Sequence, residues 1–171
     1  STYNDLRKLS AEFIASMDRE GNAIGGLSVG EPVEEMYALT DLVTDILPKE
    51  KPRYLMGVGT PANILEGIER GVDMFDCVIP TRSGRNGQAF TKYGTVNIRN
   101  SKYADDNTPL EQDCPCPACA NYSKAYLHHV VRVGEIIGSM LMTWHNIQYF
   151  QGLMSRIRTY IEEGRDFDFD C

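Results

Sequence analysis

The sequence lacks a long apolar run, an excess of positive charge and a methionine at its start. No apolar run is long enough to span a bilayer, so we expect neither a membrane-spanning protein nor a leader segment in this sequence. Lys and Arg number 17 against 24 Asp and Glu, and the net charge of −7 argues against a protein that coats nucleic acid through general charge attraction. The 171 residues, 42% hydrophobic and 24% charged, are typical of one globular domain with a core. Because residue 1 is serine, we expect a piece of a longer protein.

Cysteine is scarce, but three of the five cysteines stand within six residues, Cys114-Pro-Cys116-Pro-Ala-Cys119. Such close spacing does not suit a disulfide framework and favours metal ligation in a reducing compartment such as the cytosol. Three thiolates need one more ligand for a tetrahedral zinc ion, and His128, His129 and His145 are the candidates, among which spacing does not choose. The alternative is a set of free thiols, which the two stiffening prolines disfavour. A closed Cys3His site holds a subdomain together rather than doing chemistry.

Apolar periodicity predicts an alternating order of helices and strands in the first half of the chain. This order is typical of parallel strands joined by right-handed crossovers, although three strands cannot close a barrel. After residue 86 we expect two short strands, the cysteine loop, two long helices and a frayed Asp-rich end, 166–171. The predicted helices are 3–20, 33–47, 61–70, 122–137 and 139–163, and the predicted strands are 23–29, 53–58, 75–79, 88–91 and 95–98.

The stretch 71–85 combines a carboxylate with two cations. Asp76 lies in or near the end of the strand predicted over 75–79, and Arg82 and Arg85 lie on the loop predicted after it. Barrel enzymes place their reactive groups at the carboxyl ends of strands, which suggests an active site here. The alternative is a capping aspartate followed by a solvated basic loop.

Glycines follow the first two predicted strands. Gly25 and Gly26 indicate a close approach of the backbone to another group, either a ligand or a tightly packed barrel corner. Gly57 and Gly59 precede a helix that starts with Thr60 as N-cap, a position where a phosphate can bind but where a plain strand-to-helix turn is more common.

Four motifs in this order carry a resemblance to a known family: 25–31 (GGLSVGE), 54–61 (YLMGVGTP), 75–87 (FDCVIPTRSGRNG) and 114–119 (CPCPAC). From about residue 1 to residue 165, the chain resembles the C-terminal part of bacterial tRNA-guanine transglycosylases, also called queuine tRNA-ribosyltransferases. The resemblance implies an α/β fold: the C-terminal portion of a (β/α)8 TIM barrel, strands six to eight in three βα units over 1–100, with an appended zinc-binding helical subdomain over 101–171. A whole barrel takes about 250 residues, so roughly the last third is expected here.

The same resemblance implies an enzyme. Asp76 is then the nucleophile that attacks C1′ of the ribose at the wobble guanosine of a tRNA anticodon, and a 7-deazaguanine base (preQ1) replaces guanine in queuosine biosynthesis. A carboxylate suits a transition state that is cation-like at C1′. The zinc ligands implied are Cys114, Cys116, Cys119 and His145, and the location implied is the cytoplasm.

The resemblance also assigns binding residues to the loops. Val29 favours preQ1 over the larger queuine base, and Arg82 and Arg85 read the bases beside the wobble position. The base-binding residues implied are Gly26, Leu27, Glu31 and Met56, and the RNA-binding residues implied are Gly57, Val58, Gly59, Thr60, Pro61, Ala62, Asn63, Thr81, Arg82, Ser83, Gly84 and Arg85.

One part of the family pattern is absent from this sequence. The second catalytic aspartate and other base-recognising side chains belong to the N-terminal part, so we expect no exchange activity from this chain alone. The alternative function is a non-catalytic, zinc-stabilised RNA-binding or dimerisation module. Family members dimerise through the zinc region, which implies a homodimer with His128 and His129 on a helix surface or at the interface. The contacts expected on one helix face are Tyr122, Tyr126, His129 and Val130.

Overall fold

A computed structural model describes residues 2–165, and the end predicted to be frayed, 166–171, lies outside the described residues. The chain divides into two compact units, Ser1–Val78 and Ile79–Cys171, each with its own apolar core. Residues 79–100, which the resemblance assigns to the barrel part, belong to the second unit. The domain boundary near residue 100 stays a prediction.

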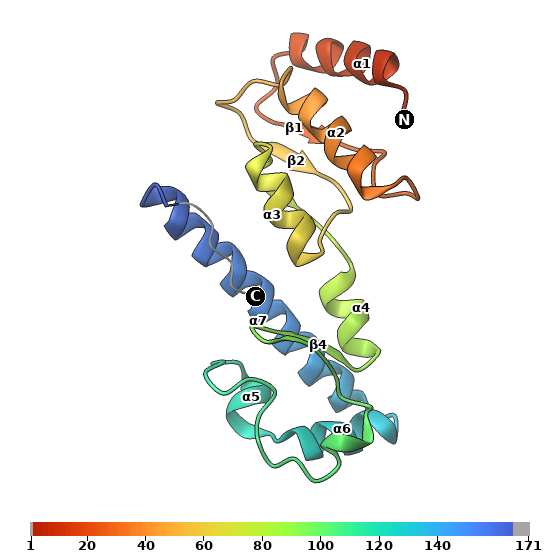
Figure 1. Ribbon diagram of the computed structural model, residues 1–171, viewed down its shortest axis with the longest axis vertical. Coiled ribbons are helices and arrows are strands. Elements are labelled where there is room, and N and C mark those ends of the chain that lie inside the picture. Colours follow the sequence, from red (N-terminus) through yellow and green to blue (C-terminus); the bar gives the residue numbers. More distant parts are fainter. Residues whose placement is uncertain (1, 166–171) are drawn as a thin grey trace. The chain divides into compact units, whose positions relative to one another are not determined.

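The first unit alternates helices and strands as the periodicity predicts (Figure 1). The strands form a parallel sheet in the order β1-β2-β3, in which Ile24 pairs with Leu55 and Leu55 pairs with Phe75. The mixed α/β class with parallel strands is therefore confirmed, and a closed barrel is not seen in residues 2–165. The elements are α1 Asn4–Ser16, β1 Asn22–Ile24, α2 Val33–Thr44, β2 Arg53–Leu55, α3 Pro61–Glu69 and β3 Met74–Phe75.

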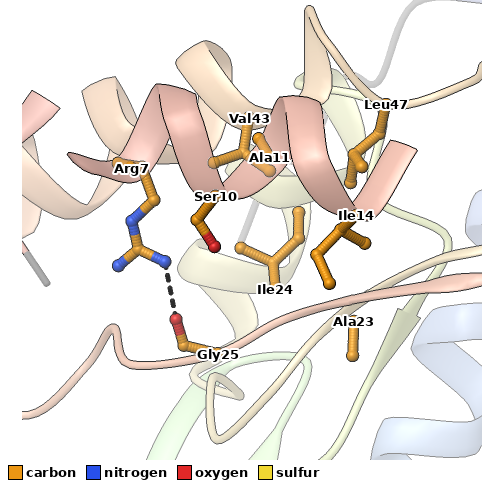
Figure 2. A pocket seen from close by; sticks show the side chains of 9 residues that line it. All are labelled: Arg7, Ser10, Ala11, Ile14, Ala23, Ile24, Gly25, Val43 and Leu47. Carbon is orange, nitrogen blue, oxygen red and sulfur yellow. Dashed lines mark hydrogen bonds between the residues drawn. The ribbon is translucent and has the colours of Figure 1, made fainter. Parts of the chain in front are cut away.

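Helix α1 presents its apolar residues outward. Leu6 is 54% exposed, and Leu9 and Phe13 are each 64% exposed. Ala11 is the buried residue of α1, and partly buried Ala15 also packs against the core. A cavity of about 220 Å³ lies between α1 and β1, and Figure 2 shows Arg7 of the helix reaching across it to the chain after β1. The amphipathic pattern thus predicts the helix but not the burial of its apolar side within this unit.

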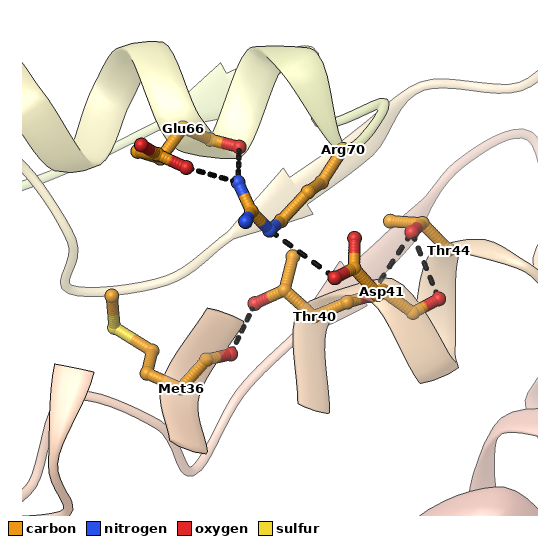
Figure 3. Close-up of polar contacts among 6 residues, drawn as sticks. All are labelled: Met36, Thr40, Asp41, Thr44, Glu66 and Arg70. Carbon is orange, nitrogen blue, oxygen red and sulfur yellow. Dashed lines mark hydrogen bonds and ion pairs between the residues drawn. The ribbon is translucent and has the colours of Figure 1, made fainter. Parts of the chain in front are cut away.

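Helices α2 and α3 are joined by polar contacts around Arg70, the residue that ends α3 (Figure 3). The Arg70 guanidinium pairs with Glu66 one turn earlier, lies 3.3 Å from Asp41 Oδ2 on α2, and stacks 4.6 Å from the centre of the Tyr37 ring. Arginine suits this position because its planar fork pairs with carboxylates and stacks on aromatic rings. These contacts fix the direction of α3 and therefore the loop that leads into it.

The second unit is mainly helical. The two short strands predicted there are present as β4 and β5, and the structure shows that they pair as an antiparallel hairpin. The predicted break between its two long helices at Gly138 is wrong. Gly134, with φ of +80°, lies in the break instead, and Gly138 lies inside the second helix. A Cβ at residue 138 would come within 2.9 Å of Val131, so close packing on the preceding helix accounts for this glycine. No helix described between residues 2 and 165 has both the length and the apolarity needed to cross a membrane. The elements are α4 Ile79–Arg85, β4 Gln88–Thr91, β5 Gly94–Asn97, the 3-10 helix η1 Ser101–Tyr103, α5 Pro117–Asn121, α6 Lys124–Arg132 and α7 Ile136–Glu162.

The strand predicted over 75–79 and the loop predicted for the two arginines are both wrong. Strand β3 stops at Phe75, and residues 79–85 form α4. A Cβ on Gly84 would lie 2.6–2.7 Å from atoms of Thr143, so the glycine lets α4 pack directly on α7. Fully buried Asn146 of α7 then donates to the carbonyls of Pro80 and Gln88, at 2.9 Å each. This packing outweighs the turn preference of the Ser-Gly pair.

Candidate active site and metal centre

The three strands of the first unit end at one edge of the sheet, because they are parallel and their last residues are in register. The loops that begin at Gly25 and Met56, and the segment that contains Asp76, therefore leave the sheet at the same edge. Segments far apart in the sequence meet there, in the manner that parallel sheets use for binding sites.

Asp76 is an exposed carboxylate held by two hydrogen bonds to one oxygen. Its Oδ1 accepts from the Tyr54 hydroxyl at 2.7 Å and from the Gly57 N–H at 2.8 Å. Both bonds lower the pKa of Asp76 below its ordinary value, and the bond from Tyr54 has the larger effect. The bond between Tyr54 and Asp76 also raises the pKa of Tyr54. Because its pKa is lowered, the Asp76 carboxylate is ionised at neutral pH. It is also exposed, and no ion pair among residues 2–165 includes it.

Sequence reasoning missed Tyr54. The sequence signal for its bond to Asp76 is a tyrosine one residue before the end of β2, the strand beside β3. This signal becomes informative only when the register of β2 and β3 is known.

The loop after β1 is held in an unusual backbone conformation. Gly26 has φ of +70°, and Ser28, which is not glycine, has φ of +58°. The Glu31 carboxylate accepts from the N–H groups of Ser28 and Val29, the latter at 3.0 Å. Burial by itself raises the pKa of Glu31, but these bonds and the charge of Arg7 outweigh it, so the pKa is lowered.

The predicted base-binding residues divide into backbone and side-chain contributors. Leu27 is 3% exposed and belongs to the core, which leaves its peptide groups to face a ligand. Val29 and Met56 are 79% and 44% exposed at the sheet edge, where their side chains are open to contact. The base-binding roles stay predictions.

The segment from Gly57 to Asn63 forms the turn into α3. Thr60 caps the helix and accepts from the Asn63 N–H at 3.2 Å, which confirms the predicted start of this helix. Val58 and Gly59 are buried, and a Cβ on Gly59 would lie 1.9 Å from the Cys77 sulfur, so this glycine is required by packing. The phosphate site suggested by the glycines stays a prediction.

The other predicted RNA-binding segment, Thr81 to Arg85, lies in α4 of the second unit. Arg82 and Arg85 are exposed on that helix, whereas Gly84 is buried against α7. Within this segment, Arg82 and Arg85 are therefore accessible for binding, whereas Gly84 serves the packing of α4 on α7. RNA contact by these residues stays a prediction.

The cysteine cluster and one histidine form a compact metal-binding group in the second unit. Cys114 precedes α5, Cys116 caps it, Cys119 lies within it, and His145 comes from the middle of α7. The four ligand atoms all lie within 4.8 Å of one another. The predicted Cys3His zinc site is thus confirmed in its membership.

The geometry of His145 fits zinc. Its Nδ1 lies 3.6, 3.6 and 3.3 Å from the sulfurs of Cys114, Cys116 and Cys119. Ligands at ordinary Zn–S and Zn–N distances in a tetrahedron are about 3.6 Å apart. Its Nε2 lies 2.8 Å from the Phe90 carbonyl, so Nε2 carries the proton that it donates there and Nδ1 keeps its lone pair for a metal.

Without a metal, the three clustered thiols do not ionise alike. The hydrogen bond from Cys119 lowers the pKa of Cys116 to about 4. This hydrogen bond is also the largest cause that raises the pKa of Cys119, and burial is the second. Burial is the first cause that raises the pKa of Cys114. A cation bound by all three sulfurs offsets the cost of ionising the buried thiols, and the fit to zinc is therefore electrostatic as well as geometric.

The other histidines lie outside this group. His128 is 4% exposed and bonds through Nδ1 to the Ile98 carbonyl at 2.7 Å, so its predicted position on a helix surface or at an interface is wrong. His129 is exposed, and Tyr126, 38% exposed, stacks on Tyr122 at 4.9 Å between ring centres. Val130 is 5% exposed, which removes it from the expected surface contacts because its side chain packs inside the unit.

Comparison with known proteins extends these observations. A family model described as queuine tRNA-ribosyltransferase matches residues 1–170. The queuine tRNA-ribosyltransferases of Rickettsia rickettsii strain Sheila Smith and Rickettsia bellii strain OSU 85-389 are 71% identical over 170 and 169 residues, and that of Rickettsia akari strain Hartford is 68% identical over 169. Each match covers 99% of this chain but 47% of the relative. The chain therefore spans about half the length of these relatives.

Proposed function

We propose, because this chain belongs to the queuine tRNA-ribosyltransferase family, that it is the C-terminal part of a tRNA-guanine transglycosylase. The whole enzyme exchanges the wobble guanine of a tRNA anticodon for the 7-deazaguanine base preQ1 in queuosine biosynthesis. It is a pentosyltransferase that works in the cytoplasm, where a reducing environment preserves the cysteine cluster.

The observation that carries this proposal is the exposed, ionised Asp76 at the carboxyl edge of the sheet. Tyr54 and Gly57 both bind Oδ1, so these contacts do not engage Oδ2, the oxygen that attacks the ribose. Oδ2 bonds to C1′ while the C1′–N9 bond breaks and its electron pair leaves with guanine. The incoming base then bonds through N9 to C1′ and displaces Asp76, which returns as a carboxylate. Guanine takes up one proton and the incoming base loses one, so protons balance over the exchange.

The hydrogen bonds to Oδ1 serve both halves of this exchange. They keep Asp76 ionised as an attacking group, and they stabilise the negative charge that returns when the sugar leaves. Double displacement at the sugar carbon follows the logic of retaining glycosidases.

The base is recognised at the same edge of the first unit. The peptide groups of Gly26 and Leu27 face the base, Glu31 sets which backbone donors and acceptors it meets, and Met56 forms one wall of the pocket. The exposed Val29 side chain narrows the space and favours preQ1.

RNA contact uses both units. The turn from Gly57 to Asn63 and the α4 segment from Thr81 to Arg85 bind the anticodon loop, with Arg82 and Arg85 reading bases beside the wobble position. Zinc has a structural role in the second unit. It ties α5 to α7 and, through His145 and its neighbour Asn146, holds the hairpin and α4 in place.

A second function is favoured for the chain by itself, because it spans 47% of the length of its relatives. We propose that the isolated chain is a zinc-stabilised module for RNA binding or homodimerisation that has no exchange activity. Exposed Tyr126 and His129 on α6, beside Tyr122, supply the self-association contacts.

Trapping of the covalent RNA–protein intermediate tests the proposal. A full-length protein that contains this chain is mixed with tRNA and run on a denaturing gel, as wild type, D76N and D45N; Asp45 is an exposed carboxylate at the end of α2 and serves as the control. We expect the adduct and the incorporation of radiolabelled guanine in wild type and D45N and neither in D76N. Adduct formation by D76N would refute the assignment, and guanine incorporation by the 171-residue chain alone would refute its inactivity.

A further inference from the structure

Arg7 of α1 makes a two-pronged contact with the loop that follows β1. Its Nη1 donates to the Gly25 carbonyl at 2.7 Å, the bond drawn in Figure 2, and its Nη2 donates to the Gly26 carbonyl at 3.1 Å. One planar guanidinium thus holds two consecutive peptide oxygens, an arrangement that a lysine ammonium does not reproduce. Helix α1 is thereby fastened to the start of the loop to which base recognition is assigned.

This contact determines the direction of the adjoining N–H groups. In a planar trans peptide, the C=O and the following N–H point to opposite sides. The N–H groups of Gly26 and Leu27 belong to the same two peptide units as the carbonyls that Arg7 binds. They therefore point away from α1, and their direction changes if the carbonyls are released.

The loop needs such external support because its backbone is strained. Gly26 and Ser28 have φ of +70° and +58°, a region that is unfavourable for a residue such as serine. Glu31 holds the later part of the loop through the N–H groups of Ser28 and Val29. A cation on the carbonyl side and an anion on the N–H side thus hold the loop between them.

We propose that Arg7 is a positioning residue for base recognition: its guanidinium sets the Gly25 and Gly26 peptides so that the N–H groups of Gly26 and Leu27 are presented to the base. This inference rests on the proposed function of the loop. It adds a residue of α1, outside the sheet edge, to the determinants of base binding. The cavity of about 220 Å³ beside Arg7 leaves room for other side chains, so its substitution does not require overpacking.

The first test measures loop order in the 171-residue chain, independently of activity. Amide hydrogen exchange of Ser28 and Val29 is followed by NMR in wild type, R7M, R7K and K8M. Lys8 is the neighbouring exposed residue of α1, and K8M removes the same charge without touching the loop. Loss of hydrogen bonds from a charged donor predicts exchange about tenfold faster or more in R7M, a smaller increase in R7K, and none in K8M. Equal rates in R7M and wild type, or the same increase in K8M, would overturn the proposal.

The second test measures base recognition in a full-length protein that contains this chain. We expect R7M to raise the KM for free guanine by about tenfold or more with a much smaller change in kcat, because the base is held alike in the ground and transition states. R7K should recover part of the loss, and K8M should match wild type. An active wild type with an unchanged KM in R7M would overturn the positioning role. An inactive wild type would contradict the proposed function instead, and hydrogen exchange would then decide whether Arg7 positions the loop.

Discussion

Removal of zinc should unfold the second unit and leave the first unit folded. The metal ligands come from the segment around α5 and from the middle of α7, so they join parts of the chain that are 26 to 31 residues apart. The first unit has a separate core and contributes no ligand to this group. Chelation therefore acts on one compact unit, and the chain should lose structure in two separable steps.

The expected magnitude follows from the buried site. Structural zinc contributes about 10–16 kcal/mol at neutral pH in small zinc-dependent domains, which matches or exceeds the roughly 5–15 kcal/mol net stability of an ordinary domain. The bond from His145 to the Phe90 carbonyl adds about 1 kcal/mol by itself. We expect H145A to cost most of the stability of the second unit. H129A, at an exposed position on α6, should change stability by no more than about 0.5 kcal/mol.

A single tryptophan allows unfolding of the second unit to be followed by fluorescence. Trp144 is the only tryptophan of the chain, lies next to His145 on α7, and is 54% exposed. Its fluorescence reports on the second unit, while NMR signals of the loop at Gly26 report on the first. Adding EDTA should release one zinc ion per chain, shift the tryptophan spectrum and leave the Gly26 signals in place. Purified protein without zinc, or an unchanged tryptophan spectrum after complete chelation, would refute the structural role of the metal.

Three further predictions follow from single contacts. Replacing Tyr54 with Phe should raise the pKa of Asp76 toward its ordinary value of 3.8 in a carboxyl ¹³C NMR titration, and an unchanged titration would show that the hydroxyl is not the cause of the lowered pKa. Since the native pKa is lowered, the contribution of Asp76 to stability is complete above pH 3.8 and is lost as pH falls through the native pKa. N146A should destabilise the second unit by about 3 kcal/mol or more in urea denaturation, because Asn146 makes three hydrogen bonds at 0% exposure, and a loss below about 1 kcal/mol would contradict this account. G84A should lower the free energy of unfolding by about 1–3 kcal/mol, because the added methyl group overpacks the contact of α4 with α7. G152A, where a Cβ would have no neighbour within 4 Å, should instead stabilise α7 by up to about 1 kcal/mol, and equal melting temperatures for the two variants would argue against this packing.

Local patterns predicted the order of elements well. Thr60 and Pro61 marked the start of α3 because capping is a property of a few neighbouring residues. The three clustered cysteines predicted a metal site for the same reason, since all three lie within six consecutive residues. Choosing His145 among three histidines depended on the resemblance, and the structure supports the choice because α7 brings its Nδ1 to the sulfurs.

Errors arose where distant segments decide the local conformation. The Pro, Ser and Gly residues of 79–85 suggested a loop, yet α7 offers a surface on which Gly84 allows close packing, so these residues form a helix. His128 was expected on a helix surface or at an interface, but the carbonyl of Ile98 accepts its ring N–H inside the unit. Neither partner is adjacent in the sequence, and neither could be inferred from composition or spacing.

The sequence by itself determined the family, the alternating α/β order and the residue types of the zinc site, because each is encoded in short motifs or in periodic apolar positions. Tertiary structure alone decided that Tyr54 donates to Asp76 and that Arg7 donates to the Gly25 carbonyl. The first contact depends on strand register, and the second depends on where helix α1 lies against the loop. Hydrogen bonds act over about 3 Å, so a chain reveals its long-range partners only when packing has brought them together.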